Sequence, residues 1–260
     1  MTKDGQQNEP REAVAAGSPV IEVKHLQKSF GSKVVLSDFN LTIGMSENLV
    51  VMGRSGIGKT VLIKCIIGLL KPDGGTLRVL GQDISKLNHR ELDELRTRIG
   101  FVFQNSALYD SMTVRQNLEF PLRRHRAQKI NGSMDSVVRE SLRNVGLENT
   151  IDLMPSELSG GMRKRIGIAR SLILKPELVL YDEPTTGLDP ITSEEISHLI
   201  LDLQQKYKNT SIIITHDVDL ARETANRIVF LMNGIVYFEG TYDDMLNSKD
   251  EVIKHFFKRQ

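Results

Sequence analysis

The residues best suited to chemistry in this chain are those that could hold a phosphate. An octapeptide at residues 53–60 fits the pattern G-x-x-x-x-G-K-[ST] at every fixed position. Glycines allow successive backbone N–H groups to curl around phosphate oxygens at a helix N-terminus, where the helix dipole favours negative charge. The lysine neutralises the β- and γ-phosphates, and the threonine hydroxyl can ligate Mg²⁺. The residues expected to bind a nucleotide here are Gly53, Arg54, Ser55, Gly56, Ile57, Gly58, Lys59 and Thr60.

Two adjacent carboxylates, Asp182 and Glu183, end an apolar run at residues 178–181. A carboxylate at the C-terminal edge of a parallel strand faces the crevice where ligands bind. We expect Asp182 to hold the Mg²⁺ shell and Glu183 to polarise an attacking water near the γ-phosphate. A solvated strand end is the usual interpretation of such a pair alone, and the phosphate loop upstream argues against it.

Gln104 and His216 also follow predicted strands, at residues 99–103 and 211–215. His216 is a candidate for contacting the γ-phosphate, and Gln104 could reach the metal or a water. Either residue alone is weak, since most histidines and glutamines in such positions serve the surface or the core. Their shared placement at strand ends, with the phosphate loop and Asp182, makes them candidates.

The sequence LSGGM at residues 158–162 leads into a predicted helix at residues 161–174. Alone it would be an ordinary turn. The N-terminus of a helix offers unpaired N–H groups, which could receive a γ-phosphate. Beside the phosphate loop and the two carboxylates, it indicates an ATPase that closes its nucleotide sites by pairing with a second copy.

The elements that must position these residues alternate between extended and helical patterns, which predicts an α/β fold with a parallel sheet. Residues 49–52 are apolar throughout, as in a buried parallel strand, and run directly into the phosphate loop. Further strands are predicted at residues 20–23, 34–36, 39–43, 76–80, 99–103, 178–181, 211–214 and 228–231, with a hairpin strand at 235–239. Helical patterns cover residues 60–70, 91–98, 113–145, 161–174, 193–206 and 219–225.

The composition limits the kinds of function that the chain can have. Its 260 residues suffice for one large domain, and a net charge of +1 gives no basic surface typical of nucleic-acid binding. The single cysteine, Cys65, excludes an internal disulfide and is expected to be a buried helical residue. No apolar run approaches the roughly 20 residues that a membrane helix needs. We therefore expect a cytoplasmic chain that works at a membrane only through a partner, with residues 1–18 as a disordered leader.

Seven elements in this order identify a resemblance to the nucleotide-binding subunit of ATP-binding-cassette (ABC) transporters. They are Phe30, the loop at residues 53–60, Gln104, LSGGM, YDEP at residues 181–184, TGLD at residues 186–189 and His216. The resemblance implies a P-loop NTPase parallel core with an antiparallel β subdomain, at residues 19–104 and 158–245. It also implies an inserted α-helical subdomain at residues 105–157 and a C-terminal helix at residues 246–260.

The same resemblance implies a mechanism with ATP and Mg²⁺. Two subunits would face head to tail and sandwich two ATP molecules. Phe30 would stack on the adenine, and Ser159, Gly160 and Gly161 would hold the ATP bound to the other subunit's phosphate loop. Asp189 would lie at the dimer seam. Glu183 would be the base, His216 the γ-phosphate sensor, Lys59 and Gln104 would contribute to catalysis, and Thr60, Gln104 and Asp182 would bind the metal.

Several segments resemble the ATPase of Mla/Mce-type phospholipid transporters in particular. These are residues 53–60 with their Ser-Gly-Ile-Gly-Lys-Thr, 103–108, 117–123, 153–165 and 189–192. The resemblance implies an integral membrane permease, docked by residues just after Gln104, and an Mce-type lipid-binding protein. The ATPase would then sit on the cytoplasmic face of the inner membrane, and phospholipid would move between the inner and outer membranes. Met162 departs from the glutamine common after LSGG, and the intact remainder of the site still predicts an active enzyme.

Other functions remain open at this point. An importer or exporter ATPase for another substrate shares these motifs. A soluble ATPase acting on DNA or ribosomes is less favoured, because the chain has neither a long coiled coil nor a second cassette. A regulatory module without turnover is disfavoured because both Glu183 and His216 are present. The basic run at residues 123–126 fits a solvated helix face as well as a site for a permease or anionic headgroups.

Overall fold

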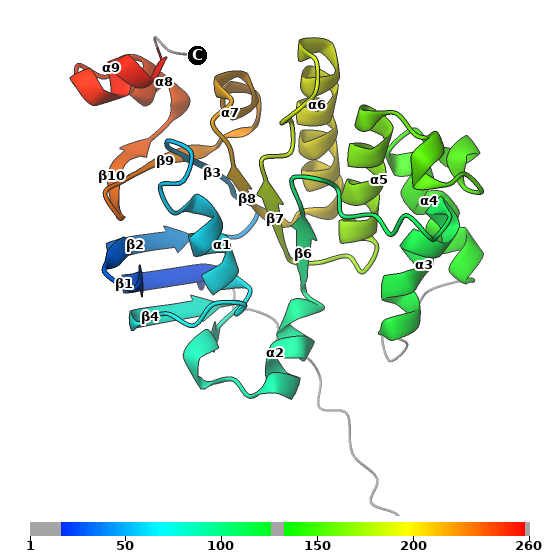
Figure 1. Cartoon of the computed structure of the whole chain (residues 1–260), viewed down its shortest axis with the longest axis horizontal. Coiled ribbons are helices and arrows are strands. Elements are labelled where there is room, and N and C mark those ends of the chain that lie inside the picture. Colours follow the sequence, from blue (N-terminus) through cyan, green and yellow to red (C-terminus); the bar gives the residue numbers. More distant parts are fainter. Residues whose placement is uncertain (1–16, 126–132, 258–260) are drawn as a thin grey trace, which may run out of the picture.

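The computed structural model describes residues 17–125 and 133–257 of the chain (Figure 1). The leader expected at residues 1–18 lies almost wholly outside this range, as do Arg126 of the basic run and residues 258–260.

Two β-sheets organise the described residues. The first is antiparallel, with the order β2-β1-β4-β5, and the second has the order β10-β9-β3-β8-β7-β6. Within the second sheet every pair is parallel except β9 with the edge strand β10. The strands are β1 (Ile21–Phe30), β2 (Lys33–Ile43), β3 (Asn48–Met52), β4 (Gly74–Val79), β5 (Gln82–Asp83), β6 (Ile99–Val102), β7 (Leu178–Asp182), β8 (Thr210–Ile214), β9 (Arg227–Met232) and β10 (Ile235–Gly240).

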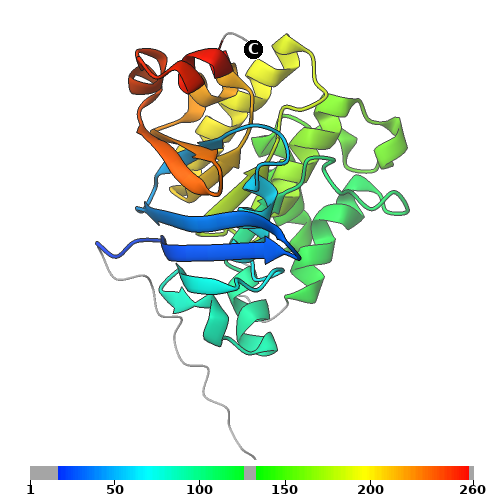
Figure 2. The same ribbon diagram turned by 60° about the vertical axis from the view of Figure 1, so that its left-hand side comes forward.

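The helices connect and cover these sheets. They are α1 (Lys59–Ile66), α2 (His89–Arg96), α3 (Val114–Arg124), α4 (Met134–Asn144), α5 (Gly160–Leu172), α6 (Pro190–Tyr207), α7 (Val218–Thr224), α8 (Tyr242–Leu246) and α9 (Glu251–Phe257). Short 3₁₀ turns lie at Ile84–Lys86, Glu148–Thr150 and Pro155–Glu157. Both views place the antiparallel sheet at one end of the molecule and α3 and α4 at the other (Figures 1 and 2).

The parallel sheet separates two hydrophobic cores because side chains alternate along each strand. Val50 and Met52 of β3 face one core, which also holds apolar residues of α3, α4, α5 and α6. Leu49 and Val51 face the other core, shared with α1 and the antiparallel sheet. Consequently α1 and α5 cover opposite faces of the sheet. The strands of the parallel core are almost completely buried, as their continuous apolar sequences indicate.

The antiparallel sheet is joined to the parallel one by Arg227 at the start of β9. Its guanidinium donates to Glu47 at 2.7 Å, to Glu239 of β10, and to the carbonyl oxygen of Thr42 in β2 at 2.5 Å. Charge-assisted hydrogen bonds of this kind are among the stronger polar contacts in proteins. They fix β2 against the edge of the parallel sheet that carries β9 and β10.

Three local expectations differ from the structure. The two short strands predicted at residues 34–36 and 39–43 are one strand, β2, because register shifts in its pairing with β1 absorb the polar residues between them. The helical interval at residues 113–145 holds two helices, since α3 ends at Arg124 and Ser133 caps a new helix. The helix expected at residues 246–260 begins only at Glu251, because α8 ends at Leu246 and a short connection follows it. Ile253 of α9 is buried, and Phe256 packs edge-on against Phe230.

No helix among the described residues is both long and apolar enough to span a membrane.

Candidate nucleotide site

The phosphate loop at residues 53–60 is packed tightly between β3 and the antiparallel sheet. Gly53 has φ 149°, and a Cβ atom there would lie 2.6 Å from the carbonyl oxygen of Leu231. Gly58 has φ 123°, and its Cβ would lie 2.8 Å from Val35 Cγ1. Only glycine satisfies both restrictions at these positions. Gly58 is also the N-cap of α1 and supplies no side-chain cap, so the N–H groups of the first turn suit a phosphate.

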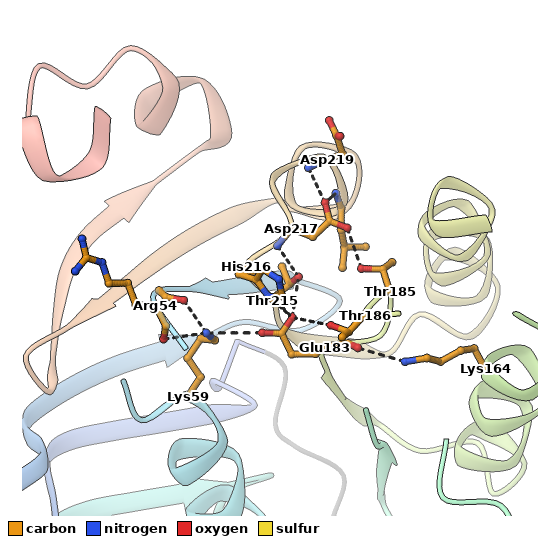
Figure 3. A network of polar contacts seen from close by, with 12 residues as sticks. Arg54, Lys59, Lys164, Glu183, Thr185, Thr186, Thr215, His216, Asp217 and Asp219 are labelled. Atoms are coloured by element: carbon orange, nitrogen blue, oxygen red, sulfur yellow. Dashed lines mark hydrogen bonds and ion pairs between the residues drawn. The ribbon is translucent and has the colours of Figure 1, made fainter. Parts of the chain in front are cut away.

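Lys59 places a buried cation at the centre of this loop. Its ammonium donates to the carbonyl oxygen of Gly53 at 2.6 Å and lies 3.7 Å from Glu183 Oε1 (Figure 3). Burial lowers the pKa of Lys59, and the charges of Glu183 and Asp182 oppose this shift. A cation held by carbonyl oxygens and one carboxylate fits the β- and γ-phosphates of a nucleotide.

Asp182, the last residue of β7, and Thr60 of α1 form a pair of oxygen donors. Burial raises the pKa of Asp182, with a further contribution from the charge of Glu183, while a hydrogen bond with the Thr60 hydroxyl and the charge of Lys59 oppose the shift. A carboxylate and a hydroxyl in contact are ligand types that Mg²⁺ prefers. The described residues contain no cluster of three His, Cys, Asp or Glu side chains that could hold a metal. Magnesium here would therefore need phosphate oxygens and water, and it would neutralise phosphate charge.

Glu183 adopts a strained backbone conformation immediately after β7. Its φ is +50°, a left-handed region that costs a non-glycine residue about 1–2 kcal/mol. The Glu183 N–H donates to the carbonyl oxygen of Ile214 at 2.9 Å, which ties the residue to the end of β8. This conformation turns the carboxylate toward the phosphate loop, where Oε1 lies near Lys59.

The other carboxylate oxygen of Glu183 accepts hydrogen bonds from several groups (Figure 3). His216 Nδ1 lies 2.8 Å from Oε2, and the hydroxyls of Thr186 and Thr215 lie 3.4 Å from the same atom. A carboxylate accepts only, so Nδ1 carries the proton in this arrangement and Nε2 of the half-exposed ring remains available. The two threonines were not predicted from the sequence, although each lies within three residues of a predicted site residue.

Gln104 lies at the same edge of the sheet, two residues beyond β6. Strands β6 and β7 are parallel, with Val102 opposite Tyr181, so Gln104 and Glu183 stand at corresponding levels. Gln104 is exposed, and its main-chain carbonyl oxygen accepts a hydrogen bond from Lys164 Nζ at 2.5 Å. Lys164 was not singled out in the sequence, and only its position three residues before Gly167 on α5 indicates that it faces inward.

Phe30 ends β1 with its ring about half exposed. The Lys28 ammonium lies 5.4 Å from the ring centroid, which is within the range of a cation–π contact.

Ser159, Gly160 and Gly161 start helix α5 on the opposite face of the parallel sheet from α1. Ser159 is exposed and caps the helix by accepting the Met162 N–H at 3.2 Å. In residues 17–125 and 133–257, no hydrogen bond or ion pair joins these three residues to the loop at residues 53–60. The structure therefore separates the two phosphate-binding elements that the sequence predicts.

Asp189 lies beside this helix terminus. It caps α6, accepting the Thr192 N–H at 3.0 Å and the Thr192 hydroxyl at 2.6 Å. Both hydrogen bonds from Thr192 lower the pKa of Asp189, and the one from the hydroxyl contributes most. A Cβ atom on Gly161 would lie 2.7 Å from Thr192 Cγ2, so the N-termini of α5 and α6 touch. Asp189 and residues 159–161 thus form one exposed surface.

Comparison with known proteins agrees with this geometry. The ABC transporter family model matches residues 36–186. The chain belongs to the ABC transporter ATPase family. It is an ATPase subunit that uses ATP with Mg²⁺, and its fold confirms the expected parallel core with an antiparallel sheet.

Individual relatives cover most of the chain. It is 41% identical over 236 residues to the probable ribonucleotide transport ATP-binding protein Mkl of Mycobacterium leprae, covering 91% of this chain and 68% of that protein. It is 40% identical to the intermembrane phospholipid transport system ATP-binding protein MlaF of Haemophilus influenzae, covering 92% of this chain and 90% of that protein. The methionine import ATP-binding protein MetN of Brucella abortus is 37% identical over 87% of this chain and 61% of its own length.

A solved structure shares the same fold. The dimeric post-hydrolysis state of the ATP-binding cassette MJ0796 bound to ADP and Pi has a TM-score of 0.75 and 32% identity, and the match covers 85% of this chain and 98% of that one.

Proposed function

We propose that this chain drives a transporter that moves phospholipid between the inner and outer membranes of a bacterium, as in Mla/Mce-type systems. The observation that carries this proposal is the likeness to MlaF, which covers 92% of this chain and 90% of the relative. The proposal also rests on the segments around Met162, from residue 153 to residue 165, which resemble Mla/Mce ATPases.

A transport ATPase for another substrate is the second candidate. Relatives named for ribonucleotide transport and for methionine import have comparable identity, 41% and 37%. ABC ATPases do not contact the cargo through the nucleotide site, so the site geometry is common to all these functions. The substrate must therefore be found from the membrane partners.

In the proposed reaction a water attacks the γ-phosphorus of ATP, and the bond to the ADP oxygen breaks. Glu183 orients this water and accepts its proton, while Lys59 stabilises the phosphate charge. His216 donates a hydrogen bond to Glu183 in the structure. A γ-phosphate that contacts the other side of this ring would therefore affect the position of the carboxylate. Thr60 and Asp182 hold Mg²⁺, Gln104 lies within reach of metal or water, and Phe30 stacks on the adenine.

A second copy of the chain completes the site in this proposal. The exposed start of α5 and Asp189 form a surface that lies away from the chain's own phosphate loop. In a head-to-tail pair, Ser159, Gly160 and Gly161 of each chain would reach the γ-phosphate held by the other. The N–H groups of an open helix terminus supply the necessary donors. No nucleic-acid partner is proposed.

The permease is proposed to dock in a groove of about 740 Å³ between the parallel core and α3. Exposed apolar side chains line it, among them Phe103 directly before Gln104, Tyr109 five residues after it, and Leu69 in the turn that follows α1. Arg96, Arg124 and Arg170 also line the groove, and Asp93, which pairs with Arg96 at 2.9 Å, offsets one of these charges. The groove keeps an excess of positive charge, so an apolar helix carrying acidic residues would suit it. Docking there would attach the chain to the cytoplasmic face of the inner membrane.

Co-purification tests the proposed substrate. The full chain is isolated with its membrane partners in mild detergent, the subunits are identified, and bound lipid is analysed by mass spectrometry. We expect a permease, an Mce-type subunit and phospholipid enriched over the bulk extract. The same purification with a variant that reverses charge in the groove, Arg124→Glu, is the control and should lose the permease. A stable complex with neither an Mce-like subunit nor phospholipid contradicts the proposal.

A further inference from the structure

One buried cation of the described residues, Lys164 of α5, has no role in the reaction outlined above. The residue is 6% exposed, and its ammonium lies 2.5 Å from the main-chain carbonyl oxygen of Gln104. It lies 3.4 Å from the main-chain carbonyl oxygen of Glu183 (Figure 3). These two residues end on neighbouring strands, β6 and β7. A lysine ammonium has three donors and no acceptor, so it can hold two carbonyl oxygens at once. Burial lowers the pKa of Lys164, opposed by the charge of Glu183.

The face of α5 that carries Lys164 also holds the loop after Gln104. Lys164, Gly167 and Arg170 follow one another at intervals of three residues and so share a helix face. A Cβ atom on Gly167 would lie 3.2 Å from the Ser106 carbonyl oxygen, and Arg170 donates to that same oxygen at 3.1 Å. A side chain at position 167 would press on this loop, so glycine favours the close approach of α5.

The loop seated on α5 is in an unfavourable conformation. Ser106 and Ala107 both have left-handed backbone angles, with φ of 59° and 46°. Such non-glycine conformations persist only where surrounding contacts over-determine them. Lys164 and Arg170 supply those contacts from α5, and Arg170 also lies over the Tyr109 ring in the groove, 5.7 Å from its centroid. The loop therefore connects the groove to the carbonyl oxygen that Lys164 holds.

We propose that Lys164 is a positioning residue for ATP hydrolysis. Its ammonium fixes the main chain of Gln104 relative to the main chain of Glu183, and so holds the Glu183 carboxylate in place when the loop is seated on α5. The inference rests on the proposed catalytic role of Glu183. Through Lys164, a partner bound in the groove could therefore change the position of the Glu183 carboxylate.

The test uses Lys164→Met, which keeps the length of the side chain and removes its donors, on the purified full chain and on the chain co-purified with its permease. We expect kcat per bound nucleotide to fall about tenfold or more, because Glu183 loses its fixed position. The KM for ATP and the affinity for a fluorescent ATP analogue should stay within about twofold, since the phosphate loop is unchanged. The kcat of Lys164→Gln, which retains neutral hydrogen-bond donors, should lie between those of the wild type and Lys164→Met.

The matched control is Arg165→Met on the same helix. Arg165 contacts the Val145 carbonyl oxygen and Glu195, and neither Gln104 nor Glu183 among the described residues. This variant should lower the melting temperature and leave kcat within about twofold. If Lys164→Met does not fold, Lys164→Gln is judged by the same separation of kcat from KM, with a loss of threefold or more expected.

Glu183→Gln, assayed in parallel, distinguishes the two ways of failing. Normal turnover in Glu183→Gln removes the proposed role of Glu183. An inactive Glu183→Gln together with a Lys164 variant of unchanged kcat overturns the positioning role alone. A Lys164 variant in which kcat and nucleotide affinity fall together also overturns it, because a collapsed ATP site would then explain the loss.

Discussion

Asp182 and Glu183 are neighbours in the chain, yet the structure gives them different surroundings. Asp182 shares a hydrogen bond with Thr60 and has a raised pKa, whereas Glu183 turns to Lys59 and His216. Two adjacent carboxylates repel each other, and the contacts that each makes with a cationic or polar side chain offset this repulsion. Functional sites commonly concentrate such unfavourable electrostatics.

Replacing Asp182 by asparagine should stabilise the chain in the absence of nucleotide. The pKa of Asp182 in the folded state lies above the ordinary value of 3.8 that it has in the unfolded state. At a pH between the unfolded-state and folded-state pKa, the folded state therefore binds more protons than the unfolded state. The contribution of Asp182 to the free energy of unfolding therefore falls as pH rises through that interval. Asp182→Asn avoids this loss. Its melting temperature should exceed that of the wild type by more at pH 7.5 than at pH 4.5, measured by thermal unfolding.

With Mg²⁺ and ATP bound, the wild type should have the higher melting temperature and Asp182→Asn the lower one. The wild type should gain stability from bound metal and nucleotide, whereas Asp182→Asn lacks the proposed metal ligand and should gain less. Asp219→Asn is the control, because its carboxylate is 78% exposed and its replacement should change neither difference. An Asp182→Asn variant that melts below the wild type at pH 7.5 without nucleotide would contradict the burial account.

At the scale of elements, one buried asparagine holds the segment that joins the groove to α3. Asn117 is fully buried, and its Oδ1 accepts the Tyr109 N–H at 2.8 Å. Its amide group donates to the carbonyl oxygens of Tyr109, Met112 and Thr113 at 3.0–3.1 Å. Arg170 of α5 donates to Oδ1 at 3.3 Å. This one side chain therefore satisfies main-chain groups that would otherwise be buried without partners.

Asn117→Ala should lower the free energy of unfolding by about 3 kcal/mol, because several main-chain groups lose their hydrogen bonds inside the protein. Urea denaturation measures the change. Asn144→Ala is a matched control, since Asn144 is only half-buried and bonds to the Tyr207 hydroxyl and Lys206. It should cost about 1 kcal/mol or less. Equal costs for the two variants would show that burial of Asn117 contributes little.

At the scale of the whole molecule, the two elements proposed to bind phosphate lie on opposite faces of one sheet. α1 belongs to the core shared with the antiparallel sheet, and α5 belongs to the core shared with α3, α4 and α6. A rigid sheet between them prevents one chain from closing both on a single ATP. The proposed head-to-tail pair resolves this by using each element on a different nucleotide.

Mixing two inactive variants tests this arrangement. Ser159→Arg should block hydrolysis and spare ATP binding by the single chain, and Glu183→Gln should also be inactive. In a mixed head-to-tail pair, one site takes Glu183 from the first variant and Ser159 from the second, so it is intact. Random pairing at equal amounts should restore up to about a quarter of wild-type turnover if the sites act independently.

The measurement is ATPase activity as the ratio of the two variants is varied. Activity should peak at equal amounts and vanish at either extreme. If each site belonged to one chain, no mixture could recover activity. Hydrolysis by Ser159→Arg alone would equally remove the proposed contact across the pair.

The sequence by itself determined the features that depend on neighbouring residues. Gly53 and Gly58 indicated a phosphate loop because they stand at fixed spacing before Lys59 and Thr60 in the pattern G-x-x-x-x-G-K-[ST], which involves only neighbouring residues. Apolar runs and helical periodicity predicted most strands and helices, and the order of the motifs indicated the family. Ends of elements were less well predicted, since the length of β2 and the break between α3 and α4 depend on pairing and capping.

Only the tertiary structure decided which distant residues meet. The three cations at positions 163–165 look alike in the sequence, yet only Lys164 is buried, because the rotation of α5 against the loop after β6 selects it. Gln104, Lys164 and Glu183 are separated by 60 and 19 residues and meet through the strand order of the parallel sheet. Likewise, the placement of α1 and α5 on opposite faces follows from the packing of two cores and from no local pattern.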